Sequence, residues 1–169
     1  MEKIKKLRNS LKHYKVDGYL IPKNDEFFSE YVKESKDRLK YISNFSGSYG
    51  LGLILKNKNY LFVDGRYTLQ ANMQCGNIFK IKTMPGEMPI KVLRKKKLKI
   101  GFDPKLYTSH LLNAYFNNSN FQLKPLNSNL IDQIIKIKKN SIKSKAWLIN
   151  DKNSGENYFS KMNKIKKVL

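Results

Sequence analysis

The sequence predicts an α/β fold, with a mixed central sheet of about five or six strands and helices on both faces. Apolar residues recur at helical spacing over roughly residues 2–15, and a short apolar strand follows at 19–22. Two further apolar runs, 51–55 and 60–63, have the aliphatic and aromatic composition of strands. Over 78–82, apolar and basic residues alternate, which is typical of a half-exposed strand.

The stretch from Arg38 to Ala71 is the segment around which we expect the chain to be organised, and a hairpin over residues 51–63 lies at its centre. The polar stretch 56–59, which contains two Asn, separates its strands. A glycine-punctuated turn precedes it at 45–50, and Asp64 follows, where it can N-cap a helix running through Ala71. The residues expected to include the core of this hairpin are Leu51, Leu53, Leu55, Leu61 and Val63.

The flanking segments supply the remaining elements. We expect an exposed turn and short helix over 25–32, then a helix over 36–43 capped by Ser35. Downstream, the expected elements are a helix from Pro89 to 93, a strand over 98–103, a helix capped by Thr108 or Ser109, a strand over 121–123 and a helix beginning at Asn129.

The charge of the chain is strongly basic. A length of 169 residues fits one ordinary domain, and the formal net charge is +21. An excess of this size can indicate nucleic acid or an anionic membrane as the partner. However, 30 of the 34 basic residues are Lys and only four are Arg, the residue suited to bidentate contacts with bases and phosphates. Codon bias toward Lys, Asn and Ile explains this composition better, so we do not expect nucleic acid as the main partner.

Cysteine usage and hydropathy bear on the compartment. Cys75 is the only cysteine, which excludes an intramolecular disulfide and fits a reducing, cytoplasmic setting. We interpret Cys75 as a small, partly buried apolar residue rather than a nucleophile. The N-terminal stretch has no apolar core of a secretory signal, and no apolar run approaches the ~20 residues of a membrane span.

The segment from Arg38 to Ala71 resembles the amino-terminal domain of the Xaa-Pro aminopeptidases, the aminopeptidase P family. The family's segments resemble RLxYxTGFxGSxG followed by a hairpin and TDGRYxxQA. The matching residues are Arg38, Leu39, Tyr41, Phe45, Gly47, Ser48, Gly50, Asp64, Gly65, Arg66, Tyr67, Gln70 and Ala71. The sequence departs from this pattern at Ser43-Asn44, Tyr49 and Val63, and Phe28 stands where the family usually carries a His.

This resemblance implies a fold and a division of the chain. The fold is similar to the creatinase and prolidase amino-terminal domains, with ribonuclease-H-like layering. Residues 1–140 would form this domain, and 141–169 a linker and the truncated start of a second, similar domain. Amphipathic spacing of Tyr158, Met162, Ile165 and Val168 predicts a helix there. We expect the chain to be a truncated product or a partial chain.

The resemblance also implies where the chemistry lies. The parent enzymes release the first residue of peptides that have proline second, and they use two divalent metal ions, typically manganese, in a separate catalytic domain. No matching segment for that domain is found here. The chain's own residues agree, because His13 and His110 lie on different predicted helices and no His-Glu-x-x-His or Gly-x-Ser-x-Gly pattern occurs. We expect no catalytic residue and no metal site in this chain.

Three residues of the turn after the hairpin are the candidates for a substrate or interface site: Asp64, Arg66 and Tyr67. Arg66 stands at a predicted helix start, where the helix dipole disfavours a cation. One explanation is a local ion pair with Asp64 or another acid of the domain. The other is that Arg66 faces the catalytic domain of the same or a neighbouring subunit and binds a carboxylate there.

Two functional hypotheses remain. The first is a non-catalytic amino-terminal domain of an Xaa-Pro aminopeptidase that caps the active-site side, controls peptide access and contributes to assembly, for example as a homodimer. Its partner would be a catalytic domain of the same or another chain. The alternative is a free-standing basic module that binds RNA or an acidic protein. Salt distinguishes them, because phosphate binding weakens steeply as salt rises.

Overall fold

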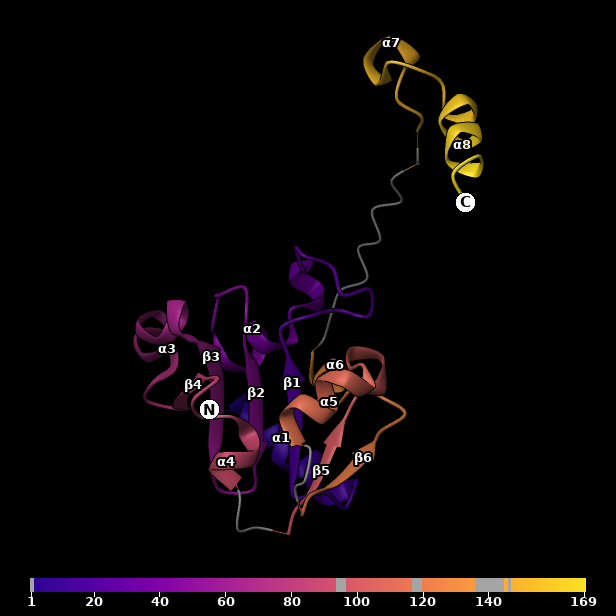
Figure 1. Cartoon of the computed structure of the whole chain (residues 1–169). Helices are drawn as coiled ribbons and strands as arrows, with labels where there is room; N and C mark the ends of the chain where they lie inside the picture. The colour runs from indigo at the N-terminus through magenta and orange to yellow at the C-terminus, as the bar shows by residue number, and fades with distance from the viewer. Residues whose placement is uncertain (1, 94–96, 117–119, 136–144, 146) are drawn as a thin grey trace. The chain divides into compact units, whose positions relative to one another are not determined.

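The structure is a computed structural model that describes residues 2–93, 97–116, 120–135, 145 and 147–169. The chain forms two compact units, Met1–Ile137 and Lys138–Leu169. The expected boundary near Asn140 lies outside the described residues. Figure 1 labels the helices and strands of both units.

The first unit is built on a mixed sheet of six strands among the described residues, in the order β4-β3-β2-β1-β5-β6. The strands are β1 (Gly18–Pro22), β2 (Leu51–Leu55), β3 (Asn59–Asp64), β4 (Lys80–Met84), β5 (Lys99–Phe102) and β6 (Gln122–Pro125). The pairs β1–β2 and β2–β3 are antiparallel, and β1–β5, β3–β4 and β5–β6 are parallel. The predicted mixed α/β fold is confirmed.

Six α-helices among the described residues of this unit cover the two faces of the sheet (Figure 1). They are α1 (Glu2–His13), α2 (Arg38–Ser43), α3 (Thr68–Cys75), α4 (Pro89–Leu93), α5 (Ser109–Phe116) and α6 (Leu130–Ile134). Buried residues of α1, α2, α3 and α6 pack on one face, and those of α4 and α5 pack on the other. Helices on both faces were expected, and the structure confirms them.

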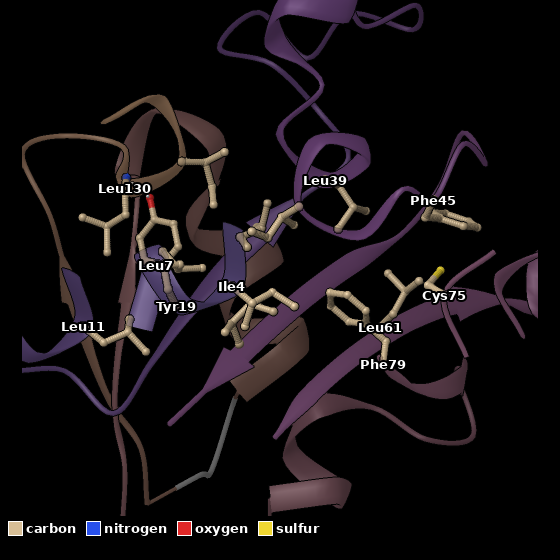
Figure 2. Packing of buried hydrophobic residues seen from close by; sticks show 14 of the residues in the cluster. Ile4, Leu7, Leu11, Tyr19, Leu39, Phe45, Leu61, Cys75, Phe79 and Leu130 are labelled. Atoms are coloured by element: carbon tan, nitrogen blue, oxygen red, sulfur yellow. Dashed lines mark hydrogen bonds between the residues drawn. The ribbon is translucent and has the colours of Figure 1, made fainter. Parts of the chain in front are cut away.

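Side-chain alternation along the hairpin divides the core between these faces. Leu61 belongs to the cluster beneath α1, α2 and α3, while its neighbour Phe62 belongs to the cluster beneath α4 and α5. Figure 2 shows Leu61 with Phe79 and Cys75 in the first cluster. Both hairpin strands are interior strands buried on two sides, which accounts for their nearly continuous apolar sequence. The five residues expected in the hairpin core, Leu51, Leu53, Leu55, Leu61 and Val63, are all buried.

The expected cap of α2 is wrong. Ser35 lies in the short 3-10 helix Glu34–Lys36, and the N-cap of α2 is Asp37, whose side chain accepts a hydrogen bond from the Lys40 backbone N–H at 3.0 Å. Asp37 stands directly before the first helical residue, so its carboxylate reaches a free amide of the first turn. The helix therefore begins two residues later than predicted.

The expected short helix over 25–32 is also absent. Asp25 there accepts hydrogen bonds from the backbone N–H groups of Phe27 and Ser29, both at 3.0 Å. These bonds hold a turn rather than a helix, and Phe28 takes a positive φ of 54° within it.

The strand predicted over 78–82 is displaced to β4, Lys80–Met84. Ile78 and Phe79 both donate their backbone N–H to the carbonyl of Cys75, at 2.9 and 2.8 Å, so they complete the end of α3. Pairing with β3 begins only at Lys80, opposite Tyr60. Residues 78 and 79 therefore belong to the end of α3, and β4 begins two residues later than the alternation of apolar and basic residues predicted.

The second unit contains α7 (Asp151–Ser154) and α8 (Tyr158–Lys166). The amphipathic helix expected from the spacing of Tyr158, Met162, Ile165 and Val168 is present as α8, which ends at Lys166, two residues before Val168. Asn157 caps it by accepting from the Ser160 N–H at 2.9 Å. Among the helices described in either unit, none has the length and apolar content needed to cross a membrane.

Candidate functional site

The candidate site is the turn that joins β3 to α3. Asp64 is the last residue of β3 and pairs in register with Met84 of β4. Its carboxylate accepts a hydrogen bond from the Arg66 backbone N–H at 2.9 Å and so caps the 3-10 helix Gly65–Tyr67. The helix α3 follows directly at Thr68. Asp64 was expected to cap the helix itself, and the structure interposes this single tight turn.

The side chains of Asp64 and Arg66 form a two-pronged ion pair. Arg66 Nη2 donates to Asp64 Oδ2 at 2.7 Å, and Arg66 Nε lies 3.2 and 3.3 Å from the two carboxylate oxygens. The hydrogen bond from the guanidinium lowers the pKa of Asp64 and raises that of Arg66. The local ion pair predicted as one explanation of Arg66 is therefore present, and 76% of the Arg66 side chain remains exposed.

Tyr67 fixes the glycine turn 45–50 against this site. Its hydroxyl lies 2.6 Å from Ser48 Oγ, and its ring meets Phe45 edge-on with centroids 6.0 Å apart. A Cβ at Gly47 would lie 2.3 Å from Phe45 Cζ and 2.9 Å from Tyr67 Cδ1, so only glycine fits between the two rings. Tyr67 therefore acts as a structural support for the turn.

Two glutamines of α3 also hold the glycine turn by hydrogen bonds to Ser46. Gln70 and Gln74 each donate from Nε2 to Ser46 Oγ at 2.9 Å, and Gln74 Oε1 accepts the Ser46 backbone N–H at 2.9 Å. Gln70 belongs to the sequence motif, but no role for it or for Gln74 was predicted. Only the fold shows that the loop before the hairpin rests on the helix after it.

The outward side of this region combines charge and apolar surface. Leu69 and Met73, one helical turn apart on α3, are 74% and 80% exposed. Arg66 Nη1 has no hydrogen-bond partner among the described residues. Within the same described part of the chain, no group of three or more His, Cys, Asp or Glu side chains could hold a metal ion. The turn is therefore suited to recognition through one guanidinium and two apolar side chains.

A second arginine cluster was not anticipated from the sequence. Arg38 of α2 is 1% exposed and binds both carboxylate oxygens of Asp132 in α6, with Nε–Oδ1 at 2.7 Å and Nη2–Oδ2 at 2.8 Å. Arg38 Nη2 also donates to Glu26 Oε1 at 2.7 Å, and Lys36 Nζ donates to the same oxygen at 2.9 Å. This cluster, formed by one buried guanidinium and two partly exposed carboxylates, links the loop after β1, helix α2 and helix α6.

The sequence contains a signal for both clusters in its choice of basic residues. Arg is rare in this lysine-rich chain, yet each of the described arginines makes at least two directed hydrogen bonds. Arg8, for example, donates to the Leu55 carbonyl at 3.0 Å and to Asn59 Oδ1 at 2.9 Å. A planar fork of donors is needed at such positions, and Lys cannot supply it.

Cys75 behaves as an apolar core residue. It is 3% exposed within the cluster of Figure 2, and burial raises the pKa of its thiol to about 11. A thiol with such a pKa stays protonated near neutral pH, which removes it from nucleophilic chemistry.

Comparison with known proteins identifies the family. The model of the creatinase/prolidase N-terminal domain matches residues 3–134. A probable Xaa-Pro aminopeptidase P from Coprinopsis cinerea is 30% identical over 173 residues, which cover 96% of this chain and 28% of the relative. Xaa-Pro aminopeptidase 1 from Dictyostelium discoideum is 29% identical over 189 residues, covering 99% of this chain and 30% of the relative. The chain thus spans less than a third of the length of these relatives.

Solved structures show the same fold. The X-prolyl aminopeptidase of Caenorhabditis elegans, a cytosolic enzyme with a di-nuclear active site, matches with a TM-score of 0.77 and 26% identity over 99% of this chain and 30% of that one. The N-terminal domain of the cytoplasmic peptidase PepQ from Mycobacterium tuberculosis matches with a TM-score of 0.61 and 22% identity, over 79% of this chain and 98% of that one. This chain is accordingly a member of the creatinase/prolidase N-terminal domain family.

Proposed function

We propose that this chain serves as the non-catalytic amino-terminal domain of an Xaa-Pro aminopeptidase that releases the first residue of peptides with proline second. The matched relatives carry that name, and the matched part occupies only 28–30% of their length. The catalytic domain would come from the same chain or from a partner chain. It would hold the two divalent metal ions, proposed to be manganese, and a cytoplasmic location fits the cytosolic relative.

In this proposal, residues 1–140 form the capping domain and residues 141–169 begin a second domain of similar fold. The resemblance of both segments to the family supports this division. The first domain would cap the active-site side, limit peptide access and contribute to assembly, for which a homodimer is the simplest form.

The observation that carries the proposal is the exposed but directed guanidinium of Arg66. Both carboxylate oxygens of Asp64 contact it, so the ion pair favours one orientation of the guanidinium before any partner arrives. A side chain ordered in advance loses little conformational entropy on binding. The neighbouring Leu69 and Met73 add apolar surface of the kind found at protein interfaces. Arg66 would therefore bind a carboxylate of the catalytic domain or of the peptide, with Asp64 and Tyr67 as its supports.

A chimeric enzyme tests this function. The segment of the Dictyostelium enzyme equivalent to this chain would be replaced by residues 1–169, and hydrolysis of a proline-second peptide would be measured with manganese present. We expect the chimera to assemble with the subunit mass of its parent and to retain turnover. The isolated chain should show none.

Two outcomes would contradict the proposal. One is a chimera that folds, by circular dichroism, but neither assembles nor turns over peptide. The other is turnover by the isolated chain that a chelator abolishes. Binding of RNA by the isolated chain that falls steeply with salt would instead favour the free-standing basic module.

A further inference from the structure

A shallow concavity lies at the free edge of the sheet in the first unit, between β4, its pairing partner β3 and helix α4. Its volume is about 370 Å³, and we name it the edge concavity. The lining residues are Tyr60, Lys80, Lys82, Gly86, Glu87, Lys91 and Val92. Three lysines and one glutamate thus converge on one hollow, which nothing in the proposed function uses.

The edge concavity already holds an anionic group, which is the carboxylate of Glu87. Lys82 Nζ donates to Glu87 Oε1 at 2.5 Å, and the Thr83 backbone N–H donates to Glu87 Oε2 at 3.2 Å. The backbone N–H of Glu87 in turn donates to the Thr83 carbonyl at 2.9 Å. An ammonium group and an edge-strand amide therefore form a receptor for an anion, and the chain fills it with its own side chain.

The other two lysines of the hollow are uncompensated. Lys80 and Lys91 are both exposed, and the ammonium group of neither has an ion pair or hydrogen bond among the described residues. After Glu87 neutralises Lys82, the edge concavity retains two positive charges. Tyr60, a largely buried residue of β3, forms part of its wall. Two uncompensated ammonium groups on one hollow match a compact ligand with two negative charges.

We propose that the edge concavity binds a small dianion of the phosphate class through Lys80 and Lys91, with Glu87 as a built-in competitor. The ligand would be either inorganic phosphate or the phosphate group of a small monoester, which present the same oxygens to the lysines. Removal of the Glu87 charge frees Lys82 as a third donor and leaves the Thr83 amide paired with a neutral amide oxygen. The Glu87 carboxylate therefore lowers the affinity of the site for phosphate, and its removal should raise that affinity.

The test is a titration of the full chain with inorganic phosphate and, separately, with phenyl phosphate. Backbone amide chemical shifts report the binding, and ionic strength is held constant with sodium chloride. We expect the largest shifts at residues of β4 and α4. Lys80→Gln combined with Lys91→Gln should weaken binding about tenfold, and Glu87→Gln should tighten it about threefold. The ligand that binds more tightly identifies the source of the phosphate group.

Matched variants separate this site from the general charge of the chain. Lys5→Gln with Lys12→Gln removes the same charge from exposed positions of α1, and Glu2→Gln frees Lys6 from an equivalent pair with an N–O distance of 2.6 Å. Neither should change the affinity by as much as twofold, whereas Lys80→Arg with Lys91→Arg should retain binding. Equal weakening by the α1 variants, shifts spread over all exposed lysines, or no tightening by Glu87→Gln would each overturn the proposal.

Discussion

Two arginine–aspartate pairs in this domain share one chemistry but differ in burial. Arg38 binds both oxygens of Asp132 with its side chain 1% exposed, and Arg66 binds both oxygens of Asp64 with its side chain 76% exposed. The buried pair joins residues 94 positions apart, while the exposed pair joins residues two positions apart. The guanidinium of Arg38 thus joins two distant segments of the chain, whereas that of Arg66 stabilises a local turn.

The difference in burial decides what each pair contributes. The two arginines differ in burial but the two aspartates do not, because the side chains of Asp132 and Asp64 are 37% and 25% exposed. A buried guanidinium that lost its partner would be an uncompensated charge out of water, which is strongly unfavourable. In an exposed pair, water replaces the lost partner, and the pair adds little to stability. We infer that Arg38 is held by the fold and that Arg66 is free to serve recognition. The predictions below test this contrast.

The largest expected effect is that of Arg38→Met. The substitution keeps an extended side chain but leaves the carboxylates of Asp132 and Glu26 without the guanidinium. We expect the free energy of unfolding, measured by urea titration, to fall by about 3 kcal/mol or more, because three charge-assisted hydrogen bonds of a buried side chain are lost. Arg38→Lys should recover only part of this loss, because a single ammonium cannot contact both Asp132 oxygens. Wild-type stability of Arg38→Met would remove the contrast between the two pairs.

Leu53→Ala in β2 provides the apolar reference for that value. Leu53 is fully buried in an interior strand, so truncation leaves a cavity and should cost about 2–5 kcal/mol. The exposed Leu69→Ala serves as its control and should leave the urea midpoint nearly unchanged. An unchanged midpoint for Leu53→Ala would mean that the hairpin is not part of the core.

Acid should weaken the Arg38 cluster specifically. Burial alone would raise the pKa of Glu26, but hydrogen bonds from Lys36 and Arg38 lower it from 4.5 to about 2. The unfolded chain therefore binds more protons than the folded chain between these values, so stability falls as pH decreases. Its contribution is complete above pH 4.5 and is lost as pH falls through about 2.

The measurement is the urea midpoint of wild type and Glu26→Gln between about pH 2.5 and 5. The variant should show a shallower decline across this range, because its side chain cannot titrate. Parallel curves for the two proteins would show that Glu26 does not carry this dependence.

The smallest expected effect on stability is that of Arg66→Lys. The exposed pair with Asp64 should leave the urea midpoint of the chain within experimental error of wild type. In the chimeric enzyme, however, the same change should weaken peptide use or subunit assembly, since Lys cannot bind a carboxylate with two parallel hydrogen bonds. Lys105→Arg, an exposed position on the 3-10 helix Pro104–Leu106, is a control that should change neither property.

Unchanged assembly and kinetics in the Arg66→Lys chimera would limit Arg66 to its local ion pair. A lowered midpoint with normal kinetics would assign it to stability, which would contradict the contrast with Arg38. Because Met and Lys are comparable in length to Arg, these substitutions change the hydrogen bonds and charge more than the size of the side chain.

The sequence by itself determined the elements whose causes are local. Residues a few positions apart explain the hairpin, the start of α4 at Pro89 and the cap of α6. At that cap, the Asn129 side chain accepts a hydrogen bond from the Ile131 N–H at 2.9 Å. The pairing of Asp64 with Arg66 is local in the same sense. Side-chain periodicity and capping act over one or two turns, so they can be read along the chain.

Only the tertiary structure decided the contacts made across the sheet. It placed β1 between β2 and β5 and brought Asp132 to Arg38. The fold also pairs Glu87 with Lys82, and it leaves the ammonium groups of Lys80 and Lys91 without an ionic partner among the described residues. The physical reason is that an ionic partner is chosen by proximity in space, and no periodic pattern in the sequence encodes which of many lysines and carboxylates will meet when the layers pack.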